Sequence, residues 1–261
     1  MGNGPKRKES LSSPHWAAAA RAWLSVVRAR RVPLLALFLG VLAPLWAFGV
    51  LAEDVWQREG FAWDAPILRA IHRVATPELD RLAVAVTMVG GARGMVPLCL
   101  LALGVLLARR RWRAATFVAL AYGGAVALDA LAKAAFRSAR PHLWVSPAPE
   151  TGYGFPSGHA MGSMALLAAL VILAWPTRGR WLALLVGAAA VTAIGLSRLY
   201  LGVHYPSDVL GAWAAALAWV IGLRLILAAP RPRVWRRAAR PAATHVDGGG
   251  GSPMSAPYAS R

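Results

Sequence analysis

Six long apolar stretches dominate the hydrophobic pattern of the chain, and shorter polar segments separate them. Because a helix of roughly 20 apolar residues crosses a bilayer core about 30 Å thick, these stretches predict six transmembrane helices. The expected spans are Val32 to Leu51, a segment within Leu82 to Ala108, Trp112 to Leu131, His159 to Trp175, Trp181 to Leu201 and Val209 to Ala229. Gly90, Gly91 and Gly94 interrupt the second stretch, which we expect to be either kinked or a short helix that leads into a span.

The pattern therefore predicts an all-α, polytopic membrane protein in three parts. Residues 1–31 are expected to form a basic N-terminal segment, and residues 32–229 a membrane domain of six helices. Residues 230–261 are expected to form a basic and then disordered tail, because Gly248 to Gly251 follow one another and few of their neighbours could pack.

The composition excludes the classes that such a basic chain first suggests. Hydrophobic residues make up 57% of the chain and charged residues only 15%, whereas soluble domains have roughly 25% charged residues. The formal net charge of +18 therefore belongs to a membrane protein, and we expect no nucleic acid as a partner. The one cysteine, Cys99, lies in an apolar stretch, which excludes a disulfide framework and a cysteine-based metal site.

The basic residues are concentrated on one side of the predicted topology. With six spans, the two termini and the connections after the second and fourth spans share a side, and 20 of the 29 Lys and Arg residues fall there. The positive-inside rule assigns this side to the cytoplasm, so we expect a protein of the plasma (inner) membrane with both termini cytoplasmic. The basic ends could also contact anionic lipid headgroups, at about 1 kcal/mol per residue, although charge that only sets the topology is the simpler interpretation.

Polar residues gather in three segments that this topology places on the extracytoplasmic side. The segments run from Lys133 to Pro141, from Phe155 to His159 and from Ser197 to Asp208. Lys133, Arg140 and Arg198 supply three fixed positive charges that could surround one oxyanion. Arg presents a planar fork suited to phosphate oxygens, and Lys a compact point charge.

The other polar residues complete a set suited to phosphoryl transfer. Ser157 and Gly158 precede a predicted helix, whose N-terminus offers free N–H groups and a positive dipole end to an anion. Asp208 follows His204 by four residues, and a carboxylate bonded to one imidazole nitrogen leaves the other free as a nucleophile or base. With His159 as a second acid–base group, these residues describe a phosphoryl-transfer site.

The spacing of these residues resembles the motifs of the type 2 phosphatidic acid phosphatase superfamily, which includes vanadium haloperoxidases and bacterial acid phosphatases. Its first motif, Lys and Arg-Pro separated by six residues, is matched by Lys133 and Arg140-Pro141. The second and third motifs are matched by Pro156-Ser157-Gly158-His159, and by Ser197-Arg198 followed at the family's spacing by His204 and Asp208. The match covers residues 77–229 and implies the helical core that this phosphatase and haloperoxidase family shares.

The resemblance implies a role for each matched residue. His204 is expected to be the nucleophile that takes the phosphoryl group, Asp208 its orienting partner, and His159 the general acid that protonates the leaving oxygen and then activates water. The expected phosphate-binding residues are Lys133, Arg140, Ser157, Gly158 and Arg198. Hydrolysis in this family needs no metal, so we expect no metal site and no cofactor.

Two charged residues near the first motif allow more than one interpretation. Asp129 lies four residues before Lys133 and on the same helix face, where it could hold the Lys133 side chain or serve helix packing. Arg137 could contact a diphosphate or lipid headgroup, or simply face water.

The leading hypothesis is an integral-membrane lipid phosphatase with its active site on the extracytoplasmic face. Six spans favour a lipid substrate, because a lipid tail can enter between helices while its headgroup reaches the outer loops. The candidate substrates are undecaprenyl diphosphate, phosphatidylglycerol phosphate and phosphatidic acid. The alternatives are a phosphotransferase that uses the same site to modify a lipid or sugar, and an anionic-lipid transporter without chemistry, which predicts inverted repeats. The sequence gives no indication of an oligomeric state.

Overall fold

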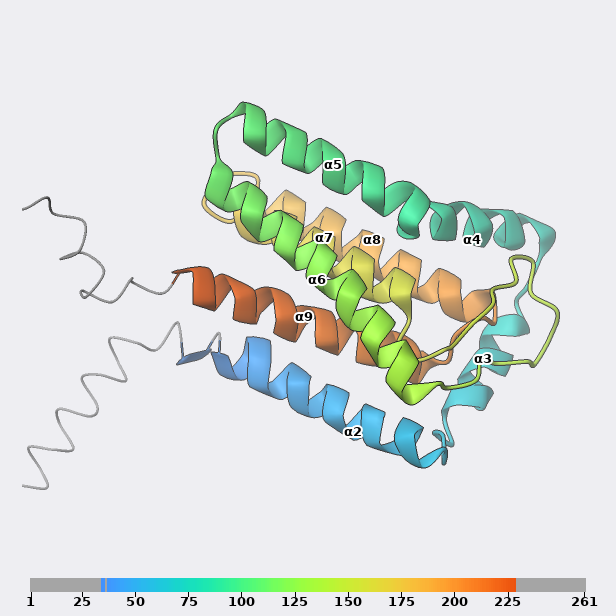
Figure 1. The fold of residues 1–261 in the computed structure, drawn as a ribbon. Helices are drawn as coiled ribbons and strands as arrows, with labels where there is room; N and C mark the ends of the chain where they lie inside the picture. The colour runs from blue at the N-terminus through green and yellow to red at the C-terminus, as the bar shows by residue number, and fades with distance from the viewer. Residues whose placement is uncertain (1–33, 36, 229–261) are drawn as a thin grey trace, which may run out of the picture. The chain divides into compact units, whose positions relative to one another are not determined.

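The computed structural model describes residues 34–35 and 37–228, which form helices and connections without a β-strand (Figure 1). The all-α prediction is confirmed over these residues. The elements in chain order are η1 (Phe38–Leu42), α2 (Ala43–Gln57), α3 (Asp64–His72), α4 (Pro77–Gly90), α5 (Ala92–Ala108), α6 (Trp112–Phe136), α7 (Gly158–Ala174), α8 (Arg180–Tyr200) and α9 (Pro206–Ala228). The predicted N-terminal segment 1–31 and tail 230–261 lie outside the described residues.

Four helices of the described chain are long and apolar enough to cross a bilayer. They are the continuous helix Phe38–Gln57 together with α6, α8 and α9. The bent pair α4 and α5 makes a fifth candidate if it counts as one span. Helix α7 is apolar but has only 17 residues. The structure thus gives four or five candidate spans by length and composition, and it does not confirm the predicted count of six.

Helix α7 lies at the centre of the bundle, where it packs against α6, α8 and α9. Small side chains allow this close packing, because Ala160, Ala165 and Ala169 on α7 are fully buried. The first turn of α7 is therefore enclosed by the ends of its neighbours. This turn carries His159 from the second polar segment.

The glycine-rich interruption of the second apolar stretch is a sharp bend between α4 and α5. The two helices differ in direction by 40°, and Gly91 between them has an extended backbone (φ −85°, ψ −173°). A Cβ atom on Gly94 would clash with the backbone of Val89, so this close turn requires glycine there. The bend agrees with both expected forms, a kinked span and a short helix that leads into a span.

The structure corrects the prediction in two places near the N-terminal half. The first helix ends at Gln57 and not at Leu51, because a helix can continue past the apolar core of the bilayer through charged residues such as Glu53 and Asp54. Helix α3, of only nine residues, was not predicted, because its apolar positions are too few to stand out beside the long spans.

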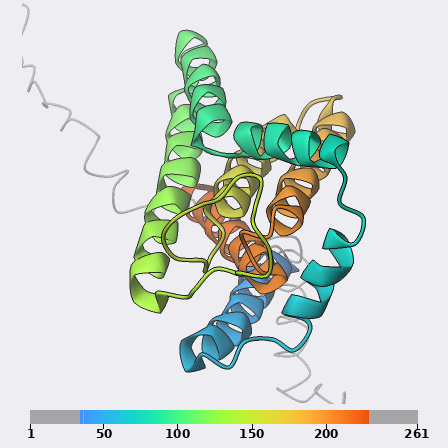
Figure 2. The same cartoon turned by 90° about the vertical axis from the view of Figure 1, so that its right-hand side faces the viewer.

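The helix order places the three polar segments at one end of the bundle and the arginine-rich turns at the other. The α5–α6 and α7–α8 turns carry Arg109 to Arg113 and Arg178 to Arg180, and Figure 1 shows both turns at the left-hand end. Figure 2 looks onto the opposite end, where the long α6–α7 connection crosses the ends of other helices. This end holds the candidate site.

Candidate active site

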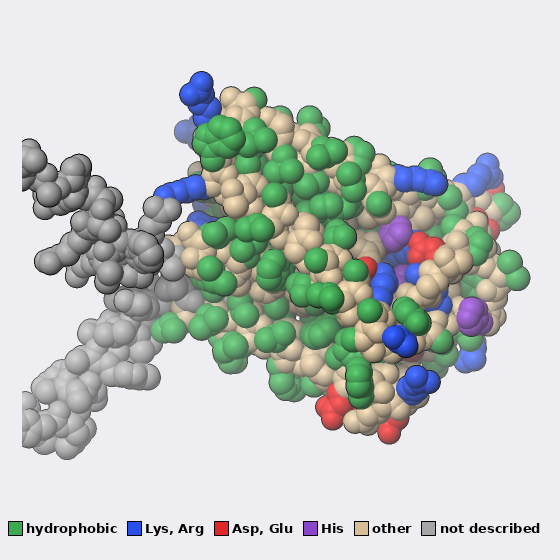
Figure 3. Space-filling view, viewed as in Figure 1, with side chains coloured by type: hydrophobic (Ala, Val, Ile, Leu, Met, Phe, Trp, Pro, Cys, Tyr) green, Lys and Arg blue, Asp and Glu red, His purple; other side chains and the backbone are tan. Residues whose placement is uncertain are grey.

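The predicted site residues gather where several helix ends meet. Figure 3 shows basic, acidic and histidine side chains together at this end, beside a flank that is largely apolar. They come from the end of α6 (Lys133), the α6–α7 connection (Arg140, Ser157), the start of α7 (Gly158, His159), the end of α8 (Arg198), the α8–α9 connection (His204) and the start of α9 (Asp208). Hydrogen bonds, ion pairs and close approaches join all eight in one cluster.

His204 and Asp208 form a buried pair at the start of α9. The Nδ1 atom of His204 lies 3.2 Å from Oδ2 of Asp208, and each residue is only 1% exposed. The same carboxylate oxygen accepts a hydrogen bond from the backbone N–H of Tyr205 at 2.9 Å, as an acidic residue in the first helical turn does in a capping box. The helix start therefore fixes Asp208, and Asp208 orients the imidazole.

The second nitrogen of His204 faces the cationic part of the site. Nη1 of Arg140 lies 2.9 Å from Nε2, an arrangement that places the imidazole proton on Nδ1 and leaves a lone pair on Nε2. Burial first, and then the charges of Arg198 and Arg140, hold the pKa of His204 well below its ordinary value of 6.5. The imidazole is thus neutral at neutral pH, which is the form that can act as a nucleophile.

Arg140 is held in place by the loop that it belongs to. Its Nε donates to the carbonyl of Gly152 at 3.2 Å, its Nη2 to that of Thr151 at 3.4 Å, and its Nη1 to that of Val203 at 2.9 Å. These bonds fix the plane of the guanidinium. A fixed guanidinium loses little side-chain entropy when it binds an oxyanion.

Arg198 is a fully buried cation at the end of α8. Its Nη1 donates to the hydroxyl of Thr87 on α4. A buried cation is stable only when an anion or several acceptors compensate it. The compensating anion is the carboxylate of Glu150, which lies opposite Arg198.

The carboxylate of Glu150, from the α6–α7 connection, occupies the space between the cations and the two histidines. It lies 2.5 Å from Nη2 of Arg198, 3.1 Å from Nη2 of Arg140, 3.7 Å from Nδ1 of His159 and 3.9 Å from Nε2 of His204. Burial raises the pKa of Glu150, but Arg198, His159 and Arg140 outweigh it and hold the pKa below its ordinary value of 4.5. The site therefore already surrounds an oxyanion.

Lys133 is held by Asp129, as one of the two sequence interpretations expected. Nζ of Lys133 donates to Oδ2 of Asp129 at 2.8 Å, and both side chains are mostly buried. A Cβ atom on Gly158 would lie 2.9 Å from this Asp129 oxygen and 3.0 Å from Nζ of Lys133. Glycine at the start of α7 thus lets the lysine approach the helix N-terminus closely.

Apart from Nη2 of Arg198, which is paired with Glu150, two buried donors of the cluster have no hydrogen-bond partner within the described part of the chain. They are the hydroxyl of Ser157 and Nε of Arg198. Ser157 is also the residue that precedes the first turn of α7, with no side-chain cap on that helix. These donors and the free N–H groups of the helix start are available to a bound oxyanion.

Three residues of the site escaped the sequence analysis: Glu150, Thr87 and Gly91. A Cβ atom on Gly91 would lie 2.6 Å from Nε2 of His159, so the α4–α5 bend touches this histidine. The glycines at the bend were a visible signal, but their link to His159 was not. Arg137 is exposed and donates from Nε to the carbonyl of Ala134 at 3.1 Å, so it faces solvent in this structure.

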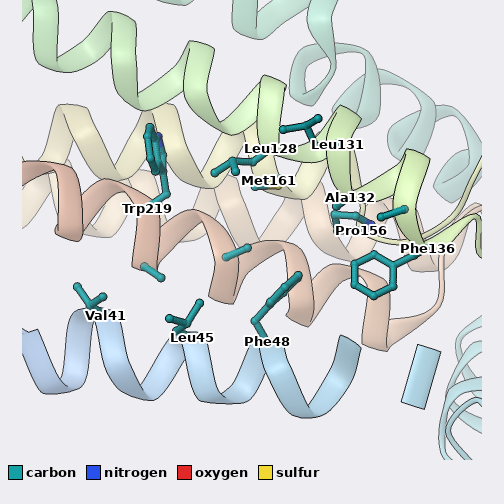
Figure 4. Close-up of a pocket in the computed structure, with 13 residues that line it drawn as sticks. Val41, Leu45, Phe48, Leu128, Leu131, Ala132, Phe136, Pro156, Met161 and Trp219 are labelled. Carbon is teal, nitrogen blue, oxygen red and sulfur yellow. The ribbon is translucent and has the colours of Figure 1, made fainter. Parts of the chain in front are cut away.

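An apolar groove of about 500 Å³ runs along the bundle between α2, α6 and α9 (Figure 4). Leu45, Phe48 and Trp219 are among the residues that line it, and it reaches Phe136 and Pro156 at the site end. Pro156 directly precedes Ser157, so the groove ends beside the oxyanion site. Among the described residues, no group of three or more His, Cys, Asp or Glu side chains is placed to hold a metal ion.

Residues 114–232 match the PAP2 superfamily. The phosphatidylglycerophosphatase B of Bacillus subtilis is 25% identical over 179 residues, which are 65% of this chain and 86% of that protein. The undecaprenyl-diphosphatase of Sulfolobus acidocaldarius is 25% identical over 169 residues, 63% of this chain and 77% of that protein. The phosphatidylglycerophosphatase B of Escherichia coli K12 is 43% identical over 74 residues, only 28% of this chain and 27% of that protein.

Two solved structures share the fold. The crystal structure of a transmembrane PAP2-type phosphatidylglycerolphosphate phosphatase from Bacillus subtilis has a TM-score of 0.64 and 22% identity, covering 70% of this chain and 93% of that one. The crystal structure of Aquifex aeolicus LpxE has a TM-score of 0.53 and 22% identity, covering 64% of this chain and 97% of that one. At this identity the likeness establishes the arrangement of helices and no more.

Proposed function

We propose that this chain is an integral-membrane lipid phosphatase. The premise is that it belongs to the PAP2 superfamily through residues 114–232 and is a phosphatase of that family. It hydrolyses a lipid phosphomonoester or diphosphate through a phosphohistidine intermediate. The substrates we consider are undecaprenyl diphosphate, phosphatidylglycerol phosphate and phosphatidic acid.

The position of Glu150 carries this proposal. Its carboxylate marks a point that two arginines bind and both histidines approach within 4 Å. A phosphoryl group at this point would lie close to Nε2 of His204. It would also lie close to His159, the second histidine that approaches the Glu150 carboxylate. Two donors, Ser157 Oγ and Arg198 Nε, have no hydrogen-bond partner among the described residues. A phosphate has more oxygen atoms than the Glu150 carboxylate, so it can accept hydrogen bonds from these two donors as well.

The first step is an attack on phosphorus by Nε2 of His204. The N–P bond forms while the P–O bond to the lipid breaks, and His159 donates its proton to the leaving oxygen. Asp208 stabilises the positive charge that develops on the His204 ring. Lys133, Arg140 and Arg198 stabilise the charge on the phosphoryl oxygens, because fixed cations in a buried site need no reorganisation during the reaction.

The second step reverses these roles. His159, now without its proton, takes a proton from water, and the water oxygen attacks phosphorus. The N–P bond breaks, the pair of electrons returns to Nε2 of His204, and inorganic phosphate leaves. Each histidine ends in its starting state.

The apolar groove supports a lipid as the leaving group. A polar substrate gains nothing from a groove lined by Leu, Phe, Met and Trp, whereas each buried methylene of an acyl or prenyl chain contributes about 0.8 kcal/mol. The groove ends at Pro156 and Phe136 beside the oxyanion site. A lipid tail in it therefore presents its phosphate to His204.

The proposed membrane arrangement has six spans, with α7 as the sixth. Its central position lets a helix of 17 residues serve as a span, because its neighbours surround it and its N-terminus begins below the outer surface. The site end then faces away from the cytoplasm, and both termini lie inside.

The test is phosphate release from the three lipids by purified protein in detergent, measured once with EDTA and, in a separate assay without EDTA, with vanadate as an inhibitor. We expect release that chelation does not affect and that vanadate blocks, because vanadate mimics the pentacoordinate transition state. Loss of activity in EDTA that Mg²⁺ restores overturns the mechanism. Label that moves from the lipid to an added alcohol or sugar, in place of water, identifies a phosphotransferase.

A further inference from the structure

Asp64 is a buried carboxylate that takes no part in the proposed chemistry. It is 5% exposed, begins α3 and lies outside the matched residues 114–232. Its Oδ1 accepts a hydrogen bond from the backbone N–H of Ser207 at 3.0 Å, and its Oδ2 accepts one from the Ser207 hydroxyl at 2.6 Å. Ser207 is the immediate neighbour of Asp208.

The contact falls on the one turn that holds the His204–Asp208 pair. Helix α9 begins at Pro206, so the N–H of Ser207 is among the donors that a helix start leaves without an intrahelical acceptor. Asp64 provides that acceptor from another helix. Asp208 in the same turn accepts from Tyr205 N–H and lies against His204, so Asp64 and Asp208 fix the two sides of one turn.

Packing holds Asp64 in place for this contact. Leu68, one helical turn further along α3, is fully buried and belongs to the same apolar cluster as Val209 of α9. Ile71 packs against that cluster as well. Helix α3 is thus docked on the start of α9 by its apolar face, with Asp64 at the end of that face.

Burial of a carboxylate is unfavourable unless donors compensate it. Burial raises the pKa of Asp64 more than the two bonds from Ser207 lower it, and the nearby Asp208 raises it further. Within the described chain, Ser207 supplies both of its hydrogen bonds. The contact is therefore specific to the first turn of α9.

We propose that Asp64 is a positioning residue for the catalytic histidine. It holds the first turn of α9 so that Asp208 stays within hydrogen-bond distance of Nδ1 of His204. The inference rests on the proposed function, because it concerns the same histidine. It adds a residue from α3 to a site whose proposed catalytic and phosphate-binding residues all lie within the matched residues 114–232.

The experiment compares four variants of the full chain in detergent: Asp64→Ala, Asp64→Asn, Ser207→Ala and Leu106→Ala. Asp64→Ala removes both bonds, and we expect kcat to fall about 10- to 100-fold, because small misplacements of reacting groups cost that much. KM and inhibition by vanadate should stay as in the wild type, since no cation of the site is touched. Ser207→Ala removes one bond and should give an intermediate kcat.

Two variants separate positioning from general stability. Asp64→Asn can accept the Ser207 N–H with its oxygen and donate its amide to the Ser207 hydroxyl, so it should restore kcat. Leu106→Ala removes a buried side chain near the end of α5 that lies opposite the site, and should lower the melting temperature without lowering kcat per active site. A kcat loss in Leu106→Ala equal to that in Asp64→Ala, or a wild-type kcat in Asp64→Ala, overturns the proposal.

Hydrogen exchange gives a readout that does not depend on activity. In Asp64→Ala we expect faster exchange in a peptide covering Tyr205 to Asp208, and unchanged exchange around Lys133, with Asp64→Asn like the wild type. Unchanged exchange at the start of α9 contradicts the positioning role. A wild-type protein that releases phosphate from none of the lipids contradicts the proposed function, and the exchange result still decides the role of Asp64.

Discussion

The two histidines differ in their surroundings, and the roles that we propose for them rest on this difference. His204 has Asp208 on Nδ1 and is almost fully buried. His159 has no carboxylate on its own helix and lies 3.7 Å from Glu150 through Nδ1. An imidazole with a fixed acid partner suits the nucleophile, and one without it can exchange protons with substrate and water.

Replacing each histidine by alanine should therefore give different kinetics. His204→Ala should abolish both turnover and the formation of a labelled phosphoenzyme that is stable in alkali and labile in acid, as a phosphohistidine is. His159→Ala should lower turnover by roughly 10²- to 10⁴-fold for a lipid alcohol as leaving group, and less for a diphosphate, whose leaving phosphate needs less protonation. Rapid quenching with labelled substrate measures both. Labelled phosphohistidine in His204→Ala, with none in His159→Ala, reverses the assignment.

Glu150 competes with substrate for the two arginines, and its charge sets the strength of that competition. Glu150→Gln keeps the size of the side chain but removes the charge, so we expect KM to fall about tenfold, which corresponds to about 1.4 kcal/mol. The kcat should change little. Initial rates over a range of lipid concentration in mixed micelles measure KM. A higher KM in Glu150→Gln means that this carboxylate helps substrate to bind.

The same carboxylate predicts a pH dependence of stability. The pKa of Glu150 in the folded protein is below 4.5, so its ionised form stabilises the fold. This contribution is complete above pH 4.5 and disappears as the pH falls through the lower folded value. Melting curves should show Glu150→Gln less stable than the wild type at pH 7, with the difference vanishing in more acidic buffer. A difference that persists at the lowest pH contradicts this explanation.

The spacing of the motif residues predicted which residues gather at the candidate site. It did not predict that they surround the carboxylate of Glu150. Lys133, Arg140 and His204 could be selected because their types and intervals suit phosphate chemistry. Glu150 lies in an irregular loop, and sequence spacing does not determine where a loop side chain points. Thr87 was equally inaccessible to prediction, since an uncharged residue on a distant helix carries no sign of its contact with Arg198.

Among the elements, the bend between α4 and α5 connects backbone geometry to chemistry. Gly91→Ala places a methyl group within 2.6 Å of the present position of His159 Nε2. Because the helix start of α7 is enclosed, His159 has to shift, and we expect kcat to fall by up to about 100-fold. Steady-state kinetics on a phosphomonoester lipid measure the loss.

Gly104→Ala on α5 is the matched control for that substitution. A Cβ atom there meets no other atom within 4 Å, and alanine stabilises a helix interior by about 0.5–1 kcal/mol relative to glycine. Activity should stay at the wild-type level. Equal losses in the two variants indicate that stiffening the helix pair, and not contact with His159, lowers activity.

The long helices were predictable and the short one was not, for a physical reason. Residues 112–136 and 180–200 contain long apolar windows of a length that suits a bilayer span, so their sequence alone identifies them. Helix α3 has nine residues and gains its order from packing of Leu68 against α9, which sequence periodicity does not reveal. Helix ends were also uncertain, because the first helix passes through Glu53 and Asp54 where the apolar pattern stops.

At the scale of the whole molecule, the two ends of the bundle differ in charge and in chemistry. Arg109 to Arg113 lie at the end opposite to the site, and the positive-inside rule places that end in the cytoplasm. We therefore expect the site to face the outside, where lipid phosphates of the outer leaflet are accessible.

Cysteine labelling in intact cells tests this orientation. Val145 in the α6–α7 connection is 94% exposed, and Arg111 between α5 and α6 is exposed as well. With Cys99 replaced by alanine, we expect Val145→Cys to react with a membrane-impermeant maleimide in intact cells. Arg111→Cys should react only after permeabilisation. The opposite pattern places the site in the cytoplasm.

The carboxylate of Glu150 between Arg140 and Arg198 also bears on which lipids can bind, because phospholipids surround a membrane enzyme on all sides. Most bilayer lipids are phosphodiesters with one negative charge on phosphorus, the same charge as Glu150, so exchange of one for the other brings little electrostatic gain. A terminal phosphate carries nearly two charges at neutral pH and can displace the carboxylate. We therefore expect the Glu150 carboxylate to keep abundant phosphodiester lipids from saturating the site, and to leave it open to the rare lipids that end in phosphate.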